Sequence, residues 1–266
     1  MAGGLTSRVA EWLSYRPSDL LMFSPAVYDR LFEAWNRQMA PVAILASLAA
    51  LALLAWRVDE RFRRRRTNRP VRGPWRAAAP TVLAATLGGL ALLWLLIAWG
   101  FHARLWAPVF SAAPVYALMF AGQGVALTAV AIWTVRSPGW CWAERGARPR
   151  VAAGLTLSAV VLHPGVGWVA GHTARPLEWF GLAPEPTALG TLALWLVLRP
   201  PPGACGRWAW RLLGVVPLAW GGLAALTLHT MERPIPAAWV ATLTGLTLAT
   251  ALATPANASP ADDVRR

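Results

Sequence analysis

Long apolar runs alternate with short polar segments along most of the chain. A helix rises 1.5 Å per residue, so about 20 apolar residues are needed to cross the roughly 30 Å hydrocarbon layer of a membrane. The pattern therefore predicts an all-α fold, a polytopic transmembrane helix bundle of about seven spans. The expected spans are residues 40–56, 80–99, 109–135, 151–170, 187–198, 208–228 and 235–253.

The fifth of these runs, residues 187–198, is the shortest. It is long enough for a full crossing only if its helix begins at Pro184, so a tilted, half-buried start or a re-entrant loop before it stays open. Pro114 and Pro164 interrupt the third and fourth runs, and prolines at such positions kink a span without ending it.

The segment before the first span predicts an N-terminal amphipathic helix. Ser24 is a suitable N-cap for a helix with Pro25 at its first position. We expect this helix to lie on the outer interface and lead into the first span; docking against the bundle is the alternative. The expected organisation is an extracytoplasmic segment (1–39), the bundle (40–254) and a cytoplasmic tail (255–266). The apolar stripe consists of Val27, Leu31, Phe32, Trp35 and Met39.

The composition excludes an ordinary soluble domain. Hydrophobic residues make up 56% of the chain and charged residues only 14%, whereas about 25% charged is usual for soluble domains. All 25 basic residues are arginine, and they concentrate between the apolar runs. The formal net charge of +13 therefore indicates membrane topology, and we expect no nucleic-acid partner.

The distribution of arginine predicts the orientation. Short basic loops are retained in the cytoplasm, and nine arginines follow the first span between residues 57 and 76. The second, fourth and sixth loops hold only Arg104, Arg175 and Arg233. We therefore expect a plasma (inner) membrane protein with its N-terminus outside and its C-terminus in the cytoplasm, whose partners are the bilayer and its anionic headgroups. The arginines expected to contact headgroups are Arg61, Arg63, Arg64, Arg65 and Arg66.

Histidine and glutamate side chains gather on the predicted outer half. His163 lies about 18 Å along the fourth span, where a polar ring is unfavourable unless it has a partner. His102, His229 and Glu232 are expected to be loop residues that face water. Glu185 stands where a helix N-terminus begins, so a capping role is the alternative for it. The candidate outer polar site is Arg175, Glu178, Glu185, Thr187, His172 and His163.

Gln123 is the other deep polar residue, and Gly122 and Gly124 flank it. Its amide can join neighbouring helices by a hydrogen bond. No phosphate-binding loop, dinucleotide-binding motif or zinc-protease motif is present in the sequence. Cofactors therefore stay unknown, and so does a metal site.

Three stretches resemble a known family. They are YRPSDLLMFSP (15–25) with Tyr28 and Asn36, FGLAPEPT (180–187), and PLAW (217–220). The sequence resembles an uncharacterised bacterial family of multi-pass membrane proteins, domain of unknown function 6064. The resemblance implies the fold but no mechanism. Glu185 stands where the family has aspartate, and His163 where it has tyrosine. The family pattern falls on Arg175, Glu178, Gly181, Pro184, Pro186 and Thr187.

Three kinds of function remain open. The first is a small-solute transport or binding protein whose mouth lies between the fourth and fifth spans. The second is a non-catalytic membrane subunit or scaffold that packs against other subunits through Gly167 and Gly171. The third is a membrane-embedded metal-dependent enzyme in which His172, Glu178 and a further histidine converge.

Overall fold

The computed structural model describes most of the chain, and residues 64–67 and 74–78 are described by their backbone alone. The expected headgroup contacts Arg64, Arg65 and Arg66 therefore have no described side chains, and the expected tail lies outside the described residues. The described residues are 24–67, 74–137, 139–143, 146–170 and 177–253.

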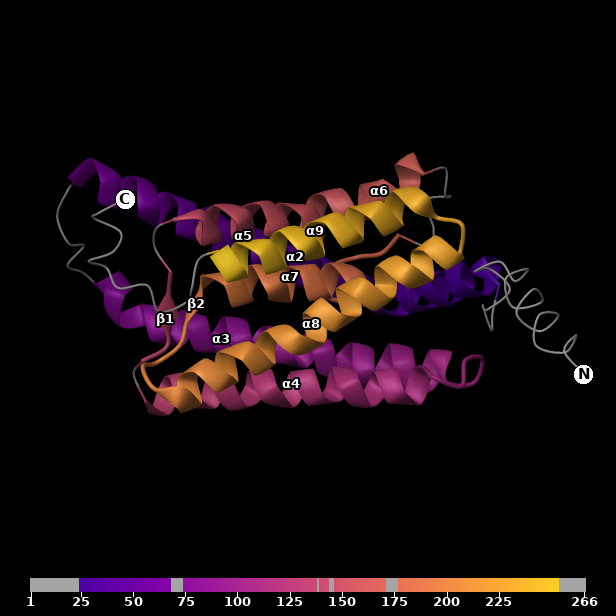
Figure 1. Cartoon of the computed structure of the whole chain (residues 1–266), viewed down its shortest axis with the longest axis horizontal. Coiled ribbons are helices and arrows are strands. Elements are labelled where there is room, and N and C mark those ends of the chain that lie inside the picture. Colours follow the sequence, from indigo (N-terminus) through magenta and orange to yellow (C-terminus); the bar gives the residue numbers. More distant parts are fainter. Residues whose placement is uncertain (1–23, 68–73, 138, 144–145, 171–176, 254–266) are drawn as a thin grey trace, which may run out of the picture.

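The chain folds into a bundle of helices that run along one common direction (Figure 1). This confirms the predicted all-α bundle. Two-residue strands, β1 (Cys141–Trp142) and β2 (Leu198–Arg199), pair antiparallel at one end. The helices are α2 Pro25–Thr67, α3 Pro74–Leu96, π-helix η2 Ile97–Trp106, α4 Ala113–Arg136, α5 Ala147–Leu157, π-helix η3 Ser158–Leu162, α6 His163–Val169, α7 Pro184–Val197, α8 Ala204–Thr230 and α9 Pro234–Ala253.

Six helical stretches of the described part are long and apolar enough to cross a membrane. Large apolar side chains such as Leu45, Leu118 and Leu252 are exposed on the outside of the bundle, where lipid rather than water is a suitable solvent. The chain is therefore an integral, multi-pass membrane protein. The six stretches are Pro25–Arg63, Ala79–Trp106, Ala113–Arg136, Ala147–Val169, Ala204–Thr230 and Pro234–Ala253.

The fifth expected span is the exception. Its helix, α7, begins at Pro184 and has 14 residues, which gives a length of about 21 Å, less than the hydrocarbon thickness. Nearly all of its residues are buried, so it is a core helix surrounded by the others. Residues 177–183, which contain no helix, lead into α7 part-way along the bundle (Figure 1).

The predicted N-terminal helix is continuous with the first span. Val27 donates its backbone N–H to the Ser24 carbonyl at 3.0 Å, which confirms the predicted start at Pro25. Phe32 and Trp35 are buried, and the Phe32 ring lies 4.6 Å from that of Phe101. The helix therefore docks against the bundle, the alternative given above, because its aromatic side chains are buried there.

The loops fall at two ends of the bundle. The pairing of Cys141 with Arg199 brings the third and fifth loops to one end, here called the arginine end. At the opposite end, the Arg233 guanidinium binds the Asp29 carboxylate at 2.7 Å, which joins the sixth loop to the start of α2. This arrangement matches the alternation of loops predicted from the arginines.

Candidate functional site

The interruption before α7 is held by hydrogen bonds from neighbouring residues. Gly181 has φ +85°, a left-handed conformation that glycine adopts without strain. The Thr187 hydroxyl accepts the Gly181 N–H at 2.9 Å and donates to the Ala183 carbonyl at 2.7 Å. This buried hydroxyl bridges the extended segment and the first turn of α7.

Helix α2 supplies the other partners. The Trp35 indole donates to the Leu182 carbonyl at 3.1 Å, and the Asn36 amide donates to the Leu177 carbonyl at 2.7 Å. Non-helical backbone inside a membrane protein is stable only where such partners satisfy it. The docked part of α2 therefore supplies the hydrogen-bond donors that stabilise this non-helical segment.

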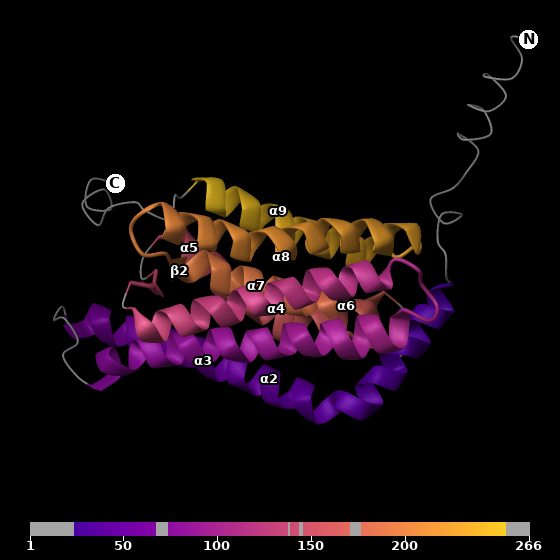
Figure 2. The same ribbon diagram turned by 90° about the horizontal axis from the view of Figure 1, so that it is seen from below.

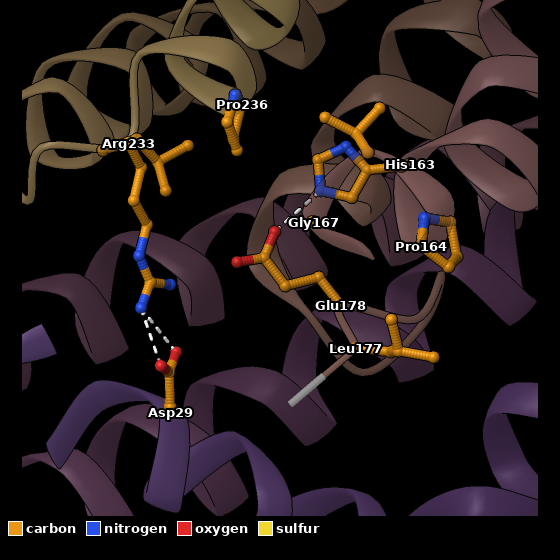
Figure 3. Close-up of a pocket in the computed structure, with 10 residues that line it drawn as sticks. Asp29, His163, Pro164, Gly167, Leu177, Glu178, Arg233 and Pro236 are labelled. Carbon is orange, nitrogen blue, oxygen red and sulfur yellow. Dashed lines mark hydrogen bonds and ion pairs between the residues drawn. The ribbon is translucent and has the colours of Figure 1, made fainter. Parts of the chain in front are cut away.

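Two polar pairs meet beside the interruption. His163 Nε2 and Glu178 Oε2 lie 2.7 Å apart, and their side chains are 3% and 15% exposed. Arg233 approaches both carboxylate oxygens of Asp29, at 2.7 and 2.8 Å. Figure 3 shows the two pairs facing each other across a small cavity of about 30 Å³, which is enough for about one or two water molecules.

Glu185 lies deeper, in the first turn of α7. Its side chain is 3% exposed and close enough to Glu178 for the two charges to interact. Tyr28 and Trp220 are its polar neighbours, and Trp220 Nε1 has no hydrogen-bond partner among the described residues. Within the described residues, Glu185 Oε2 has no hydrogen-bond partner.

His102 is fully buried in π-helix η2 rather than exposed in a loop, so its expected contact with water is wrong. Neither ring nitrogen has a hydrogen-bond partner among the described residues. The ring lies 4.6 Å from that of Phe120 and 5.4 Å from that of Trp220. Trp220 therefore contacts His102 and approaches Glu185. The prediction failed because the helix continues past Trp99 to Trp106; Pro108 was the later stop signal.

The remaining candidates behave in three ways. Gln123 donates its amide to the Leu213 carbonyl at 3.0 Å, which confirms a hydrogen bond between helices. His229 and Glu232 are exposed, as expected. His172 and Arg175 lie outside the described residues.

The structure also adds two residues that the sequence reasoning missed. Asp29 is not among the candidates named from the sequence, and Arg233 enters there only as a loop arginine. Nothing in their sequence positions, 204 residues apart, indicated that they pair. Within the parts of the chain that the structure describes, no three His, Cys, Asp or Glu residues are grouped so that they could hold a metal ion.

Comparison with known proteins gives no assignment: no family model matches the chain, and no curated protein or solved structure matches it.

Proposed function

We propose that the protein binds or transports a small solute that carries a cationic group, and that this step is coupled to proton movement. The observation that carries the proposal is the interrupted fifth crossing. It places Glu178 on a non-helical segment and Glu185 in the first turn of a half-length helix inside the bundle. Interrupted helices that expose backbone and charge in the interior are how many secondary transporters build their binding sites.

The balance of charge favours a cationic ligand. Among the described residues around the interruption, Asp29, Glu178 and Glu185 are acidic, and Arg233 already binds Asp29. A buried carboxylate is stable only when a positive charge, a proton or hydrogen bonds compensate it. The aromatic side chains of Tyr28 and Trp220 beside Glu185 also suit a cationic group.

The His163–Glu178 pair supports the coupling to protons. Imidazole and carboxylate are the side chains from which proton-coupled sites in membrane proteins are built, and these two lie 2.7 Å apart on the wall of a cavity. Glu185 is the next carboxylate inward. A proton on this group of side chains could be exchanged for the cationic group of a solute.

Residues from all three stretches that carry the family resemblance meet at this site, where the structure describes them. Asn36 binds the segment at Leu177, residues 180–187 span the end of the interruption and the first turn of α7, and Tyr28 and Trp220 flank Glu185. This convergence supports two further proposals: that the chain belongs to that bacterial family, and that its shared residues serve one site.

We also propose that the end with Asp29 and Arg233 faces outward and the arginine end faces the cytoplasm of the plasma (inner) membrane. The positive-inside tendency supports this orientation. Single cysteines at Glu232 and at Arg63, in a Cys141→Ser, Cys205→Ser background, should react with a membrane-impermeant thiol reagent from outside and from inside, respectively. If the cysteine at Glu232 reacts only from inside and the cysteine at Arg63 only from outside, the orientation is the reverse of the one proposed.

The transport proposal is tested by uptake into vesicles. Purified protein is reconstituted, a proton gradient is imposed, and uptake of radiolabelled choline and of a set of zwitterionic amino acids is measured against protein-free vesicles. Glu178→Gln and Glu185→Gln should each reduce uptake about tenfold or more, because each removes a compensating charge worth several kcal/mol in a buried site.

Glu33→Gln is the matched control, since it makes the same chemical change at a residue of α2 that does not line the cavity. Uptake that is unaffected in Glu178→Gln and Glu185→Gln, or lowered equally by Glu33→Gln, would contradict the proposal.

A further inference from the structure

A long apolar groove of about 660 Å³ lies between α2 and the rest of the bundle. Helix α2 lines one side from Val42 to Arg61, which is about 28 Å of helix, and α3, α5 and α7 line the other. Figure 2 shows α2 bowed away from α3 over its middle part. Ligand sites in proteins have volumes of about 300–1,000 Å³, so the groove is large enough for one.

The groove exists because α2 is fastened near both ends. Near its start, the Trp35 and Asn36 hydrogen bonds attach it to the segment before α7. Near the arginine end, Arg57 donates to the Ala143 carbonyl at 3.3 Å and its guanidinium lies 4.8 Å from the Trp142 ring centroid. Between these points the lining includes small residues such as Ala49 of α2 and Gly89 of α3. Their short side chains do not fill the space between the two helices.

One end of the groove carries positive charge. Arg57 and Arg61 line it there, and Glu60 binds Arg57 at 3.0 Å. Asp59 and Glu60 are the only acids among the described residues of the arginine end, so the positive charge is in excess. The loop arginines at this end whose side chains the structure describes are Arg57, Arg61, Arg63, Arg136, Arg148, Arg150, Arg199 and Arg207.

We propose that this groove binds an anionic glycerophospholipid, with the phosphate beside Arg57 and Arg61 and an acyl chain between α2 and the α3–α7 wall. Apolar walls suit hydrocarbon, and each arginine near the surface attracts an anionic headgroup. Because protein lines both sides, the occupant is a thin, flexible chain; a helix, about 10 Å wide, would push α2 aside. The site does not depend on the polar cavity or on the proposed transport.

The experiment is native mass spectrometry of the full chain in mild detergent, titrated with phosphatidylglycerol or with phosphatidylcholine of the same acyl chains. Wild type should retain one phosphatidylglycerol in preference to phosphatidylcholine. Gly89→Phe should lose retention of both lipids, because a side chain at this position would enter the groove. Gly88→Phe is the matched control: its Cβ also meets no atom within 4 Å, it does not line the groove, and it should retain lipid like wild type.

A second pair of variants tests the charge. Arg61→Gln should lower the preference for phosphatidylglycerol about fivefold, the contribution expected of one arginine near a headgroup. Arg63→Gln, which is exposed and paired with Asp59, should leave the preference unchanged. Melting temperatures within the range of wild type confirm that each variant is folded.

Three results would overturn the proposal. They are equal retention of the two lipids by wild type, unchanged retention in Gly89→Phe, and a lipid-free dimer as the main species, which would assign the groove to a second copy of the chain. Normal solute uptake by Gly89→Phe would show that lipid binding in the groove and solute transport are independent, so the transport proposal would stand even if the lipid proposal failed.

Discussion

The two cavities of the bundle differ in nearly every physical respect. The cavity beside the interruption is small, and polar or charged side chains from two helices and two connecting segments line it. The groove behind α2 is more than 20 times larger, and its lining is almost entirely apolar, with arginines at one end. The polar site is held by specific hydrogen bonds, whereas the groove results from α2 being attached only near its ends. Substitutions in the first region should therefore be far more damaging than those in the second.

The largest effect on stability is expected from Gly181→Ala. The left-handed conformation at φ +85° becomes strained, and the added Cβ would lie 2.9 Å from the Ala46 Cβ. Strain and overpacking together should lower the free energy of unfolding by about 3 kcal/mol. Unfolding in mixed micelles measures it; an unchanged value would mean that the segment before α7 is not held as described.

Thr187→Val should have the next largest effect and lower the free energy of unfolding by about 2 kcal/mol. The change keeps the shape of the side chain but leaves the buried Gly181 N–H without its acceptor, and an unsatisfied buried donor costs about 1–3 kcal/mol. Thr247→Val is the control, since that hydroxyl is equally buried and bonds only to the Leu243 carbonyl of its own helix. Equal losses for the two variants would show that the bridge adds nothing.

Asp29→Asn should lower the free energy of unfolding by about 1 kcal/mol or less, because the Asp29 side chain is 31% exposed and such ion pairs are weak. The same unfolding assay applies. Asp59→Asn, which breaks the more exposed pair with Arg63, should be close to neutral. A loss of several kcal/mol in Asp29→Asn would indicate that the cavity is closed to water.

The smallest effect is expected in the groove. Gly89→Ala adds a Cβ that meets no atom within 4 Å and replaces a helical glycine, so the free energy of unfolding should rise by about 0.5 kcal/mol. A loss similar to that of Gly181→Ala would mean that α2 packs against α3 in the membrane, and the contrast between the two regions would then fail.

The sequence predicted the helical architecture because hydrophobic run length and arginine placement act locally along the chain. It also named His163 and Glu178 as candidates on the same side of the bundle, but it left open whether they meet; in the structure they form a pair 15 residues apart. The pairing of Asp29 with Arg233 depends on how α2 docks against the α8–α9 turn, which no local pattern reveals. His102 was expected in water because the second apolar run was taken to end at Trp99; in the structure the helix continues to Trp106, and aromatic rings surround His102.

Glu185 shows most clearly what the sequence could not predict. Its position at the start of a helix was predicted, and a capping role was the alternative. That this helix starts inside the bundle follows from the path of residues 177–183, which Thr187, Trp35 and Asn36 together determine. Only the packed structure brings these side chains together.

The most direct test of the account is proton movement through the interruption. Vesicles that contain the protein and an internal pH-sensitive dye are given an inside-negative potential, and proton entry is followed. Wild type should admit protons faster than protein-free vesicles, Glu178→Gln should lower the rate about tenfold or more, and Glu33→Gln should match wild type. Equal rates in wild type and Glu178→Gln would contradict the central claim that this site handles protons.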